Sequence, residues 1–150
     1  MKVTYEIENG KMVKVKTYAD GDVRKYDKNG NEIYFKNSYG SEKWTEYDTN
    51  GNEIHYKRSN GFEVWTEYDT NGNEIHCKNS LGDETWYEYD AYGDMIHSWN
   101  NRGSEEWREY DSNGSKIHHK DSDGFEYWSE YDAYGNNIHY KNSNGYEGWC

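Results

Sequence analysis

The chain has 150 residues and a mass of 17.9 kDa, and only 32% of its residues are hydrophobic, which argues against a conventional globular core. Trp, Tyr and Phe make up 18% of the sequence, so aromatic rings must supply most of the buried apolar surface. A formal net charge of −12 argues against binding to nucleic acid or to an anionic membrane, and no apolar run of about 18 residues is present to insert into a bilayer.

Residues 1–24 are expected to form a degenerate first copy of a repeat, which caps the N-terminal end of an array. Tyr5 and Val23 lie 21 residues before Tyr26 and Trp44, two positions of the regular pattern. Altered terminal units are typical of repeat proteins, because one side of a terminal unit faces solvent. The first residues lack the apolar stretch of a secretion signal, so export would need another route or a leader that has been removed.

Residues 25–150 contain six tandem repeats of 21 residues. A tryptophan recurs at this interval without a slip, and each repeat carries a Tyr-Asp pair, an isoleucine and two glycines in constant phase. The chain ends at Cys150, part-way through a repeat, as expected for a piece of a longer array. The tryptophans are Trp44, Trp65, Trp86, Trp107, Trp128 and Trp149, and the isoleucines are Ile33, Ile54, Ile75, Ile96, Ile117 and Ile138.

Each repeat is predicted to form two strands and two turns. Large and polar side chains alternate with period two in residues 53–57 and 63–68, which is typical of half-exposed strands. Asn-Gly pairs such as Asn50-Gly51 and Asn60-Gly61 separate these strands and favour tight hairpin turns. We therefore predict an all-β fold, an antiparallel meander of about 14 strands whose single layer coils into a curved sheet or solenoid.

The odd repeat length predicts that the two turns differ by one residue, because a side chain must return to the same face after one repeat. With a three-residue loop at 49–51 and a two-residue turn at 60–61, Trp44 would face Tyr56 and Tyr56 would face Trp65. Exchanging the two loop types gives another register, which the sequence also allows. In the first register His55 lies on the opposite face, and one row crosses the sheet: Trp44, Tyr56, Trp65, Cys77, Trp86, Ser98, Trp107, His119, Trp128, Tyr140 and Trp149.

The aromatic members of this row are the candidate binding site. Rings at a fixed spacing could stack on the sugars of a polymer with avidity, and the same rings could instead serve as the core. One repeat departs from the others, since Trp99 replaces a lysine and Arg108 occupies the position of Thr45, so a specialised site would be sought there. The candidate binding residues are Trp44, Tyr56, Trp65, Trp86, Trp107, Trp128, Tyr140 and Trp149.

No catalytic residue is predicted, and the protein is not expected to be an enzyme. Glu46 and Asp48 resemble paired acid and base carboxylates, but their counterparts recur in every repeat, whereas an active site is a single constellation. Asp48 is instead expected to accept backbone N–H groups in its turn.

No metal or cofactor site is predicted either. The repeated histidines lie two strands apart, about 9.6 Å, which is too far to share a zinc ion. The acidic turns leave weak Ca²⁺ binding possible, although their glycine spacing differs from that of an EF-hand loop. Cys77 and Cys150 would lie about seven strands apart, too far for a disulfide. The histidines of this series are His55, His76, His97, His118 and His139.

The phrase EYDTNGNEIHYK, which runs from Glu46 to Lys57 and has counterparts in five other copies, resembles the YD repeats of the Rhs family. This resemblance implies β-hairpins coiled into a spiral sheet, used on bacterial surfaces or as the shell around a secreted toxin. It also implies a cell-surface or secreted location. The Trp44 and His55 series do not belong to that family's pattern.

Two functions are expected. The first is a non-enzymatic structural repeat protein, on a bacterial surface or in a self-assembling scaffold, in which the unpaired strand edges at the two ends add further copies. The alternative is a carbohydrate-binding or cell-wall-binding module that uses the aromatic row. Nucleic acid is not an expected partner.

Overall fold

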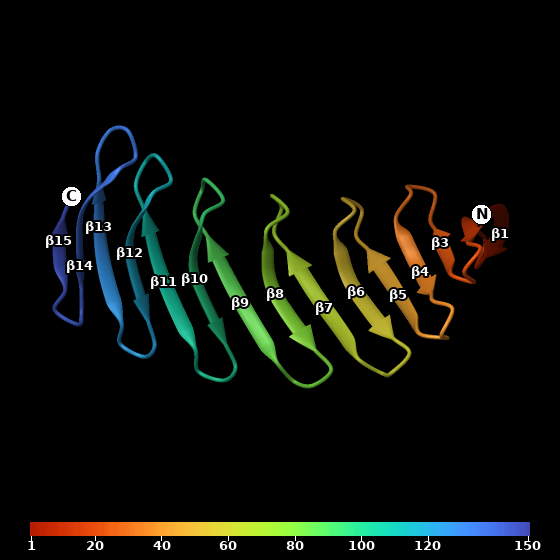
Figure 1. Ribbon diagram of the computed structural model, residues 1–150. Helices are drawn as coiled ribbons and strands as arrows, with labels where there is room; N and C mark the ends of the chain where they lie inside the picture. Colours follow the sequence, from red (N-terminus) through yellow and green to blue (C-terminus); the bar gives the residue numbers. More distant parts are fainter. The chain divides into compact units, whose positions relative to one another are not determined.

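The computed structural model describes all 150 residues and contains 15 strands and no helix. The strands form one open sheet in which each lies beside its neighbours in the sequence (Figure 1). The predicted all-β hairpin meander is confirmed. The strands are β1 (Lys2–Glu8), β2 (Lys11–Thr17), β3 (Val23–Tyr26), β4 (Glu32–Lys36), β5 (Glu42–Tyr47), β6 (Glu53–Arg58), β7 (Glu63–Tyr68), β8 (Glu74–Asn79), β9 (Glu84–Tyr89), β10 (Met95–Asn100), β11 (Glu105–Tyr110), β12 (Lys116–Asp121), β13 (Glu126–Tyr131), β14 (Asn137–Asn142) and β15 (Glu147–Trp149).

The chain forms two compact units. Unit 1 comprises Met1–Tyr68 and Cys77–Gly82, and unit 2 comprises Asp69–His76 and Asp83–Cys150. The predicted boundary between a cap and a repeat domain, after residue 24, and the predicted coiling of the layer stay predictions of the sequence. No segment forms a helix of the length and apolar character that crossing a membrane requires.

Both turns of a repeat have three-residue loops, so the predicted two-residue turn is wrong. At the first turn Asp48 N–H donates to the Asn52 carbonyl (3.0 Å), and Gly51 N–H donates back to the Asp48 carbonyl (3.2 Å). The second turn repeats this pattern, with Gly61 N–H on the Arg58 carbonyl at 2.9 Å. The glycine takes a positive φ in each turn, 91° at Gly51, which a residue with a Cβ adopts at a cost.

A β-bulge supplies the odd residue that the turns do not. In β5 and β6, Glu46 faces His55 but Tyr47 faces Glu53, so Ile54 is the extra residue of β6. One bulge per repeat restores the alternation of faces after an odd number of residues. The same shift occurs at the isoleucines Ile33, Ile96, Ile117 and Ile138.

This register corrects the predicted aromatic row. Trp44 faces Lys57, and Tyr56 faces Thr45 on one side and Val64 on the other. The tyrosines at positions 56 and 140 therefore lie on the face away from the tryptophans, because the bulge shifts the register by one residue. His55, expected on that opposite face, instead faces Trp65 directly. We call the side that carries Trp44, His55 and their counterparts the Trp face, and the other the Tyr face.

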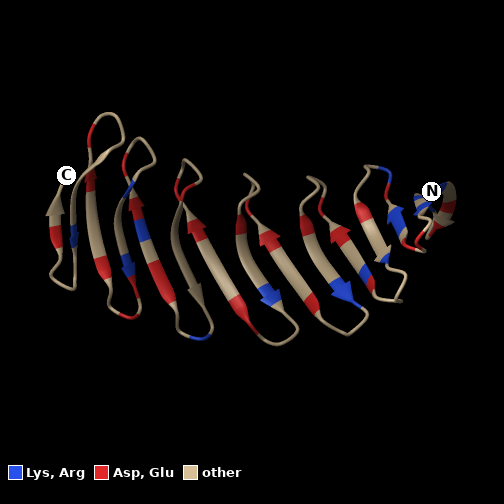
Figure 2. Cartoon of the chain, in the orientation of Figure 1, with Lys and Arg blue, Asp and Glu red and all other residues tan.

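Packing occurs mostly between neighbouring strands of the sheet. No large side chain is fully buried, and the buried side chains are the small residues Val13, Val15, Thr45 and Ser129. Even the large ring of Trp44 remains 40% exposed. Figure 2 shows acidic residues distributed along the strands of both units rather than gathered in one patch.

Candidate functional site

The aspartate of each Tyr-Asp pair holds the first turn. Asp48 Oδ1 accepts the N–H groups of Asn50 (2.8 Å) and Asn52 (2.9 Å), while Oδ2 accepts the Asn52 side-chain amide at 3.0 Å. These bonds, above all the one from the Asn52 N–H, lower the pKa of Asp48. The carboxylate that the sequence offers for acid-base work is thus engaged in turn formation. The counterparts with the same two backbone bonds are Asp27, Asp69, Asp90, Asp111 and Asp132.

In four of the Tyr-Asp pairs the tyrosine hydroxyl binds a backbone carbonyl of the preceding hairpin. Tyr47 Oη donates to the carbonyl of Glu32 at 3.1 Å, on the residue that precedes the bulged Ile33. Burial raises the pKa of Tyr47, which keeps this donor protonated. Tyr68, Tyr110 and Tyr131 make the same bond to the carbonyls of Glu53, Met95 and Lys116.

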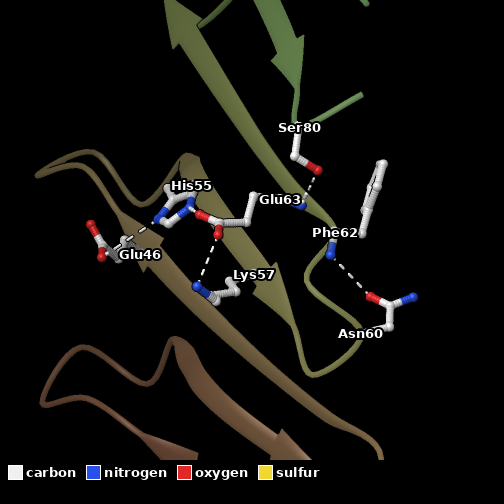
Figure 3. A network of polar contacts seen from close by, with 7 residues as sticks. All are labelled: Glu46, His55, Lys57, Asn60, Phe62, Glu63 and Ser80. Atoms are coloured by element: carbon white, nitrogen blue, oxygen red, sulfur yellow. Dashed lines mark hydrogen bonds and ion pairs between the residues drawn. The ribbon is translucent and has the colours of Figure 1, made fainter. Parts of the chain in front are cut away.

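A reciprocal pair of bonds joins five of the six second turns in residues 25–150 to the hairpin before each of them. Ser59 N–H donates to the Glu42 carbonyl at 2.9 Å, and Ser59 Oγ accepts the Glu42 N–H at 3.1 Å. The residue after the strand is therefore a latch between hairpins, and Figure 3 shows the side-chain half of the latch at Ser80 and Glu63. The same latch joins Asn101 to Glu84, Ser122 to Glu105, and Ser143 to Glu126.

The Trp face carries the most distinctive arrangement, a histidine between two glutamates from the strands on either side. His55 in β6 has Nε2 at 3.2 Å from Glu63 Oε2 in β7, and Nδ1 at 3.6 Å from Glu46 Oε1 in β5 (Figure 3). Lys57 Nζ binds the other oxygen of Glu63 at 2.9 Å. This lysine first, and His55 second, lower the pKa of Glu63. We call a histidine with its two glutamates a carboxylate clamp.

The clamp recurs with the histidine series. The distances from Nδ1 and Nε2 to the two carboxylates are 3.2 and 2.8 Å at His97, 3.4 and 2.9 Å at His118, and 3.2 and 2.9 Å at His139. In the remaining repeat His76 Nε2 lies 3.7 Å from Glu84. The glutamate pairs are Glu46 and Glu63, Glu88 and Glu105, Glu109 and Glu126, and Glu130 and Glu147.

Each histidine of the series, His76 included, also stacks on the tryptophan of the following strand. The His55 and Trp65 ring centroids are 5.2 Å apart with an interplanar angle of 8°. Rings that stand side by side at about the strand spacing cover one another's faces. The other stacked pairs, with angles of 8 to 13°, are His76 with Trp86, His97 with Trp107, His118 with Trp128, and His139 with Trp149.

The groups packed on the tryptophan rings determine which ring faces a sugar could reach. Trp128 has His118 of β12 stacked on one side and Lys141 Nζ of β14 at 5.7 Å from its ring centroid on the other. Sugars bind aromatic rings through an open ring face. Polysaccharide binding by the tryptophans and by Tyr56 and Tyr140 stays a prediction of the sequence.

The irregular repeat extends the stacking rather than breaking it. Trp99 occupies the usual lysine position. Its ring centroid lies 5.9 Å from that of Trp86 and 4.6 Å from that of His97. An open depression of about 540 Å³ in the same repeat is lined by His97, Trp107 and Arg108 among others. The two cysteines, Cys77 and Cys150, are free thiols.

Sequence reasoning found the histidine series but not its surroundings. The glutamates lie nine residues before and eight residues after each histidine, as Glu46 and Glu63 do around His55. That recurring Glu-His-Glu spacing was the available signal. It becomes a spatial cluster only with the bulged register, which brings all three side chains to one face.

No protein-family model and no curated protein matches this sequence. Solved structures are similar in fold. A Tc holotoxin pore of Photorhabdus luminescens with a mutated TccC3 superposes with a TM-score of 0.64 and 18% identity over 89% of this chain. The TcdB2-TccC3-Cdc42 and TcdB2-TccC3 structures superpose with TM-scores of 0.64 and 0.63, each at 15% identity over 91% of this chain.

This chain spans only about a tenth of the length of those chains, 9% of the first and 10% of the other two. The likeness establishes a shared fold, a sheet of repeated hairpins that also occurs in chains of toxin complexes.

Proposed function

We propose that this chain is a non-enzymatic structural repeat scaffold. The observation that carries the proposal is that polar groups able to do chemistry make the same architectural contact in repeat after repeat. Asp48 holds a turn, Tyr47 binds a neighbouring carbonyl, and Ser59 joins two hairpins. Stability in such a chain is approximately the sum of repeat and junction terms.

The comparisons support a role as part of a protein wall. The resemblance of the Tyr-Asp repeat to the Rhs family implies a bacterial surface or a shell around a toxin. The solved chains of similar fold come from Tc toxin complexes, which are multi-chain assemblies. Both lines support protein association as the setting in which this chain works.

The finer proposal is that the chain associates with copies of itself through strand edges. In this chain β1 pairs only with β2, and β15 only with β14, so each strand offers one row of backbone groups to another chain. Glu8 faces Lys11 across the two-residue Asn9-Gly10 turn, so alternate N–H groups of β1 point inward and that of Tyr5 points outward.

Sedimentation velocity over a concentration series, with electron micrographs of the same samples, tests this proposal. The unaltered chain should form concentration-dependent larger species. Tyr5→Pro removes an outward N–H and should reduce them, whereas Tyr5→Ser removes the same side chain but keeps the N–H and should not. A monomer at every concentration would contradict self-association. Equal assembly by both variants would exclude the β1 edge.

A further inference from the structure

The carboxylate clamps present acceptors to both nitrogens of one imidazole ring. At His97, Nδ1 lies 3.2 Å from Glu88 and Nε2 lies 2.8 Å from Glu105. A neutral imidazole has one N–H donor and one lone pair, so one of these contacts would set a lone pair against a carboxylate. Only the doubly protonated imidazolium donates to both. The geometry therefore favours the charged ring.

The first repeat contains a coupled replacement that supports this reading. Tyr34 stands in the histidine position, and its single O–H donates to Glu42 at 2.7 Å. In a clamp, the other glutamate lies nine residues before the histidine, as Glu46 does before His55. Nine residues before Tyr34 the chain has Lys25 instead. In this chain the second carboxylate is thus present with a histidine and absent without one. A phenol has no second proton to give, so a second carboxylate would be unpaired.

Ring orientation changes together with this replacement. The clamped histidines lie nearly parallel to their tryptophans, at 8° for His55 and Trp65, whereas Tyr34 is tilted by 52° to Trp44. A planar cation over the face of a tryptophan is attracted by the ring quadrupole. Parallel stacking therefore adds to the preference for the imidazolium.

The charges around each ring are predominantly negative. His139 faces Glu130 of β13 and Glu147 of β15, and its bond to Glu147 is the main cause that raises its pKa. Lys141 on the same strand, β14, lies over Trp128. In the His55 clamp, Lys57 is bonded to Glu63.

The other clamped rings have the same surroundings. His97 faces Glu88 of β9 and Glu105 of β11, and His118 faces Glu109 of β11 and Glu126 of β13.

His119 provides the internal contrast, because it lies on the Tyr face without a clamp. Its Nδ1 is buried and has no hydrogen-bond partner. It faces Arg108 across the strand pair, with Lys116, Glu106 and Asp121 nearby. Burial first, and then Lys116, lower the pKa of His119. One chain therefore holds clamped and unclamped histidines on neighbouring residues, 118 and 119.

We propose that the clamps are built to hold imidazolium rings, so that mild acidity tightens the junctions between hairpins and a rise through neutral pH loosens them. A bond that favours the charged histidine stabilises the fold fully below the unfolded-state pKa of about 6.5, and this stabilisation is lost as the pH rises through the folded-state value. The glutamates must stay ionised, which sets a lower limit near pH 5. The inference rests on the clamp geometry and holds whether or not the chain self-associates.

Nitrogen NMR of the histidine rings tests the proposal directly, because it reports which ring nitrogens carry a proton. On raising the pH of the intact chain, His139 should lose its second proton at a higher pH than His119 does. Glu130→Gln keeps a side chain at that position but removes the charge, and it should lower the pH at which His139 deprotonates. Deprotonation of His139 together with His119 would overturn the proposal.

Urea unfolding between about pH 5.5 and pH 8 gives the linked readout. A clamp that moves the deprotonation of its histidine up by one pH unit should raise the folding equilibrium constant about tenfold in the acidic range. Glu130→Gln should weaken this pH dependence, because it removes a carboxylate that raises the pKa of His139. The matched variant His119→Gln should leave the pH dependence intact or steepen it. A pH dependence that is flat, or that survives unchanged in Glu130→Gln, would contradict the inference. If Glu130→Gln does not fold, the ring NMR of the unaltered chain decides.

Discussion

At the scale of single residues, Asn9 differs from the other asparagines that precede glycine. In the other Asn-Gly turns the glycine N–H donates to a carbonyl, as Gly51 N–H does to Asp48, but the N–H of Gly10 has no acceptor. The Gly10 nitrogen can therefore attack the Asn9 side-chain carbonyl, expel ammonia and form a succinimide, which water opens to Asp or isoAsp. The sites with a bonded glycine are Asn29, Asn50, Asn60, Asn71, Asn113 and Asn144.

We expect Asn9 to deamidate first on storage at mildly alkaline pH. Peptide mapping by mass spectrometry over several weeks measures the rates, and Asn50 serves as the control within the chain. Deamidation of Asn50 at an equal or higher rate would show that the glycine bond gives no protection.

The Tyr47 hydroxyl should contribute measurably to stability. Tyr47→Phe leaves the half-buried carbonyl of Glu32 without its donor, which should lower the free energy of unfolding by about 1 kcal/mol. Tyr39→Phe is the matched control, because Tyr39 is 94% exposed and its hydroxyl should contribute little. Urea unfolding at constant pH compares the two. Equal losses in both variants would mean that the bond to Glu32 adds nothing.

At the scale of the elements, the bulge at Ile54 decides which side chains share a face. Because Ile54 is the extra residue of β6, its deletion leaves Glu46 opposite His55 and His55 opposite Trp65, and the paired side chains keep their faces. We therefore expect the His55 to Trp65 ring contact to survive the deletion in proton NMR. Ile54→Ala keeps the bulge and should likewise retain the contact. Loss of the contact in the deletion variant alone would show that the bulge itself is needed for the register.

The sequence predicted the strands and turn positions because alternation and positive-φ glycines are local signals. It failed on the register because an Asn-Gly pair suits a two-residue turn as well as the three-residue loop that forms at Asn60-Gly61. Nothing in the residue type of Ile54 indicates a bulge. The clamp around His55 depends on this register, so it was missed, whereas the turn role of Asp48 needs only its neighbours and was predicted correctly.

At the scale of the whole molecule, a chain of nearest-neighbour contacts should tolerate the loss of one complete repeat. Removing Asp90–Tyr110 joins Tyr89 to Asp111 and keeps the Tyr-Asp phase, the bulge and both turn types. It also removes the irregular residues Trp99 and Arg108. We expect a folded protein with a smaller m-value, the slope of the unfolding free energy against urea concentration. The m-value should fall by roughly one seventh, the fraction of the chain removed.

Circular dichroism and urea unfolding measure this outcome, and the matched control removes residues 91–110, one residue fewer. The control breaks the 21-residue phase and should lose far more stability, because its strands present the wrong side chains to their neighbours. If both deletions fold equally well, junctions between repeats are not specific. If both unfold, the repeats do not stabilise one another additively, and a scaffold that extends by repeats loses its physical basis.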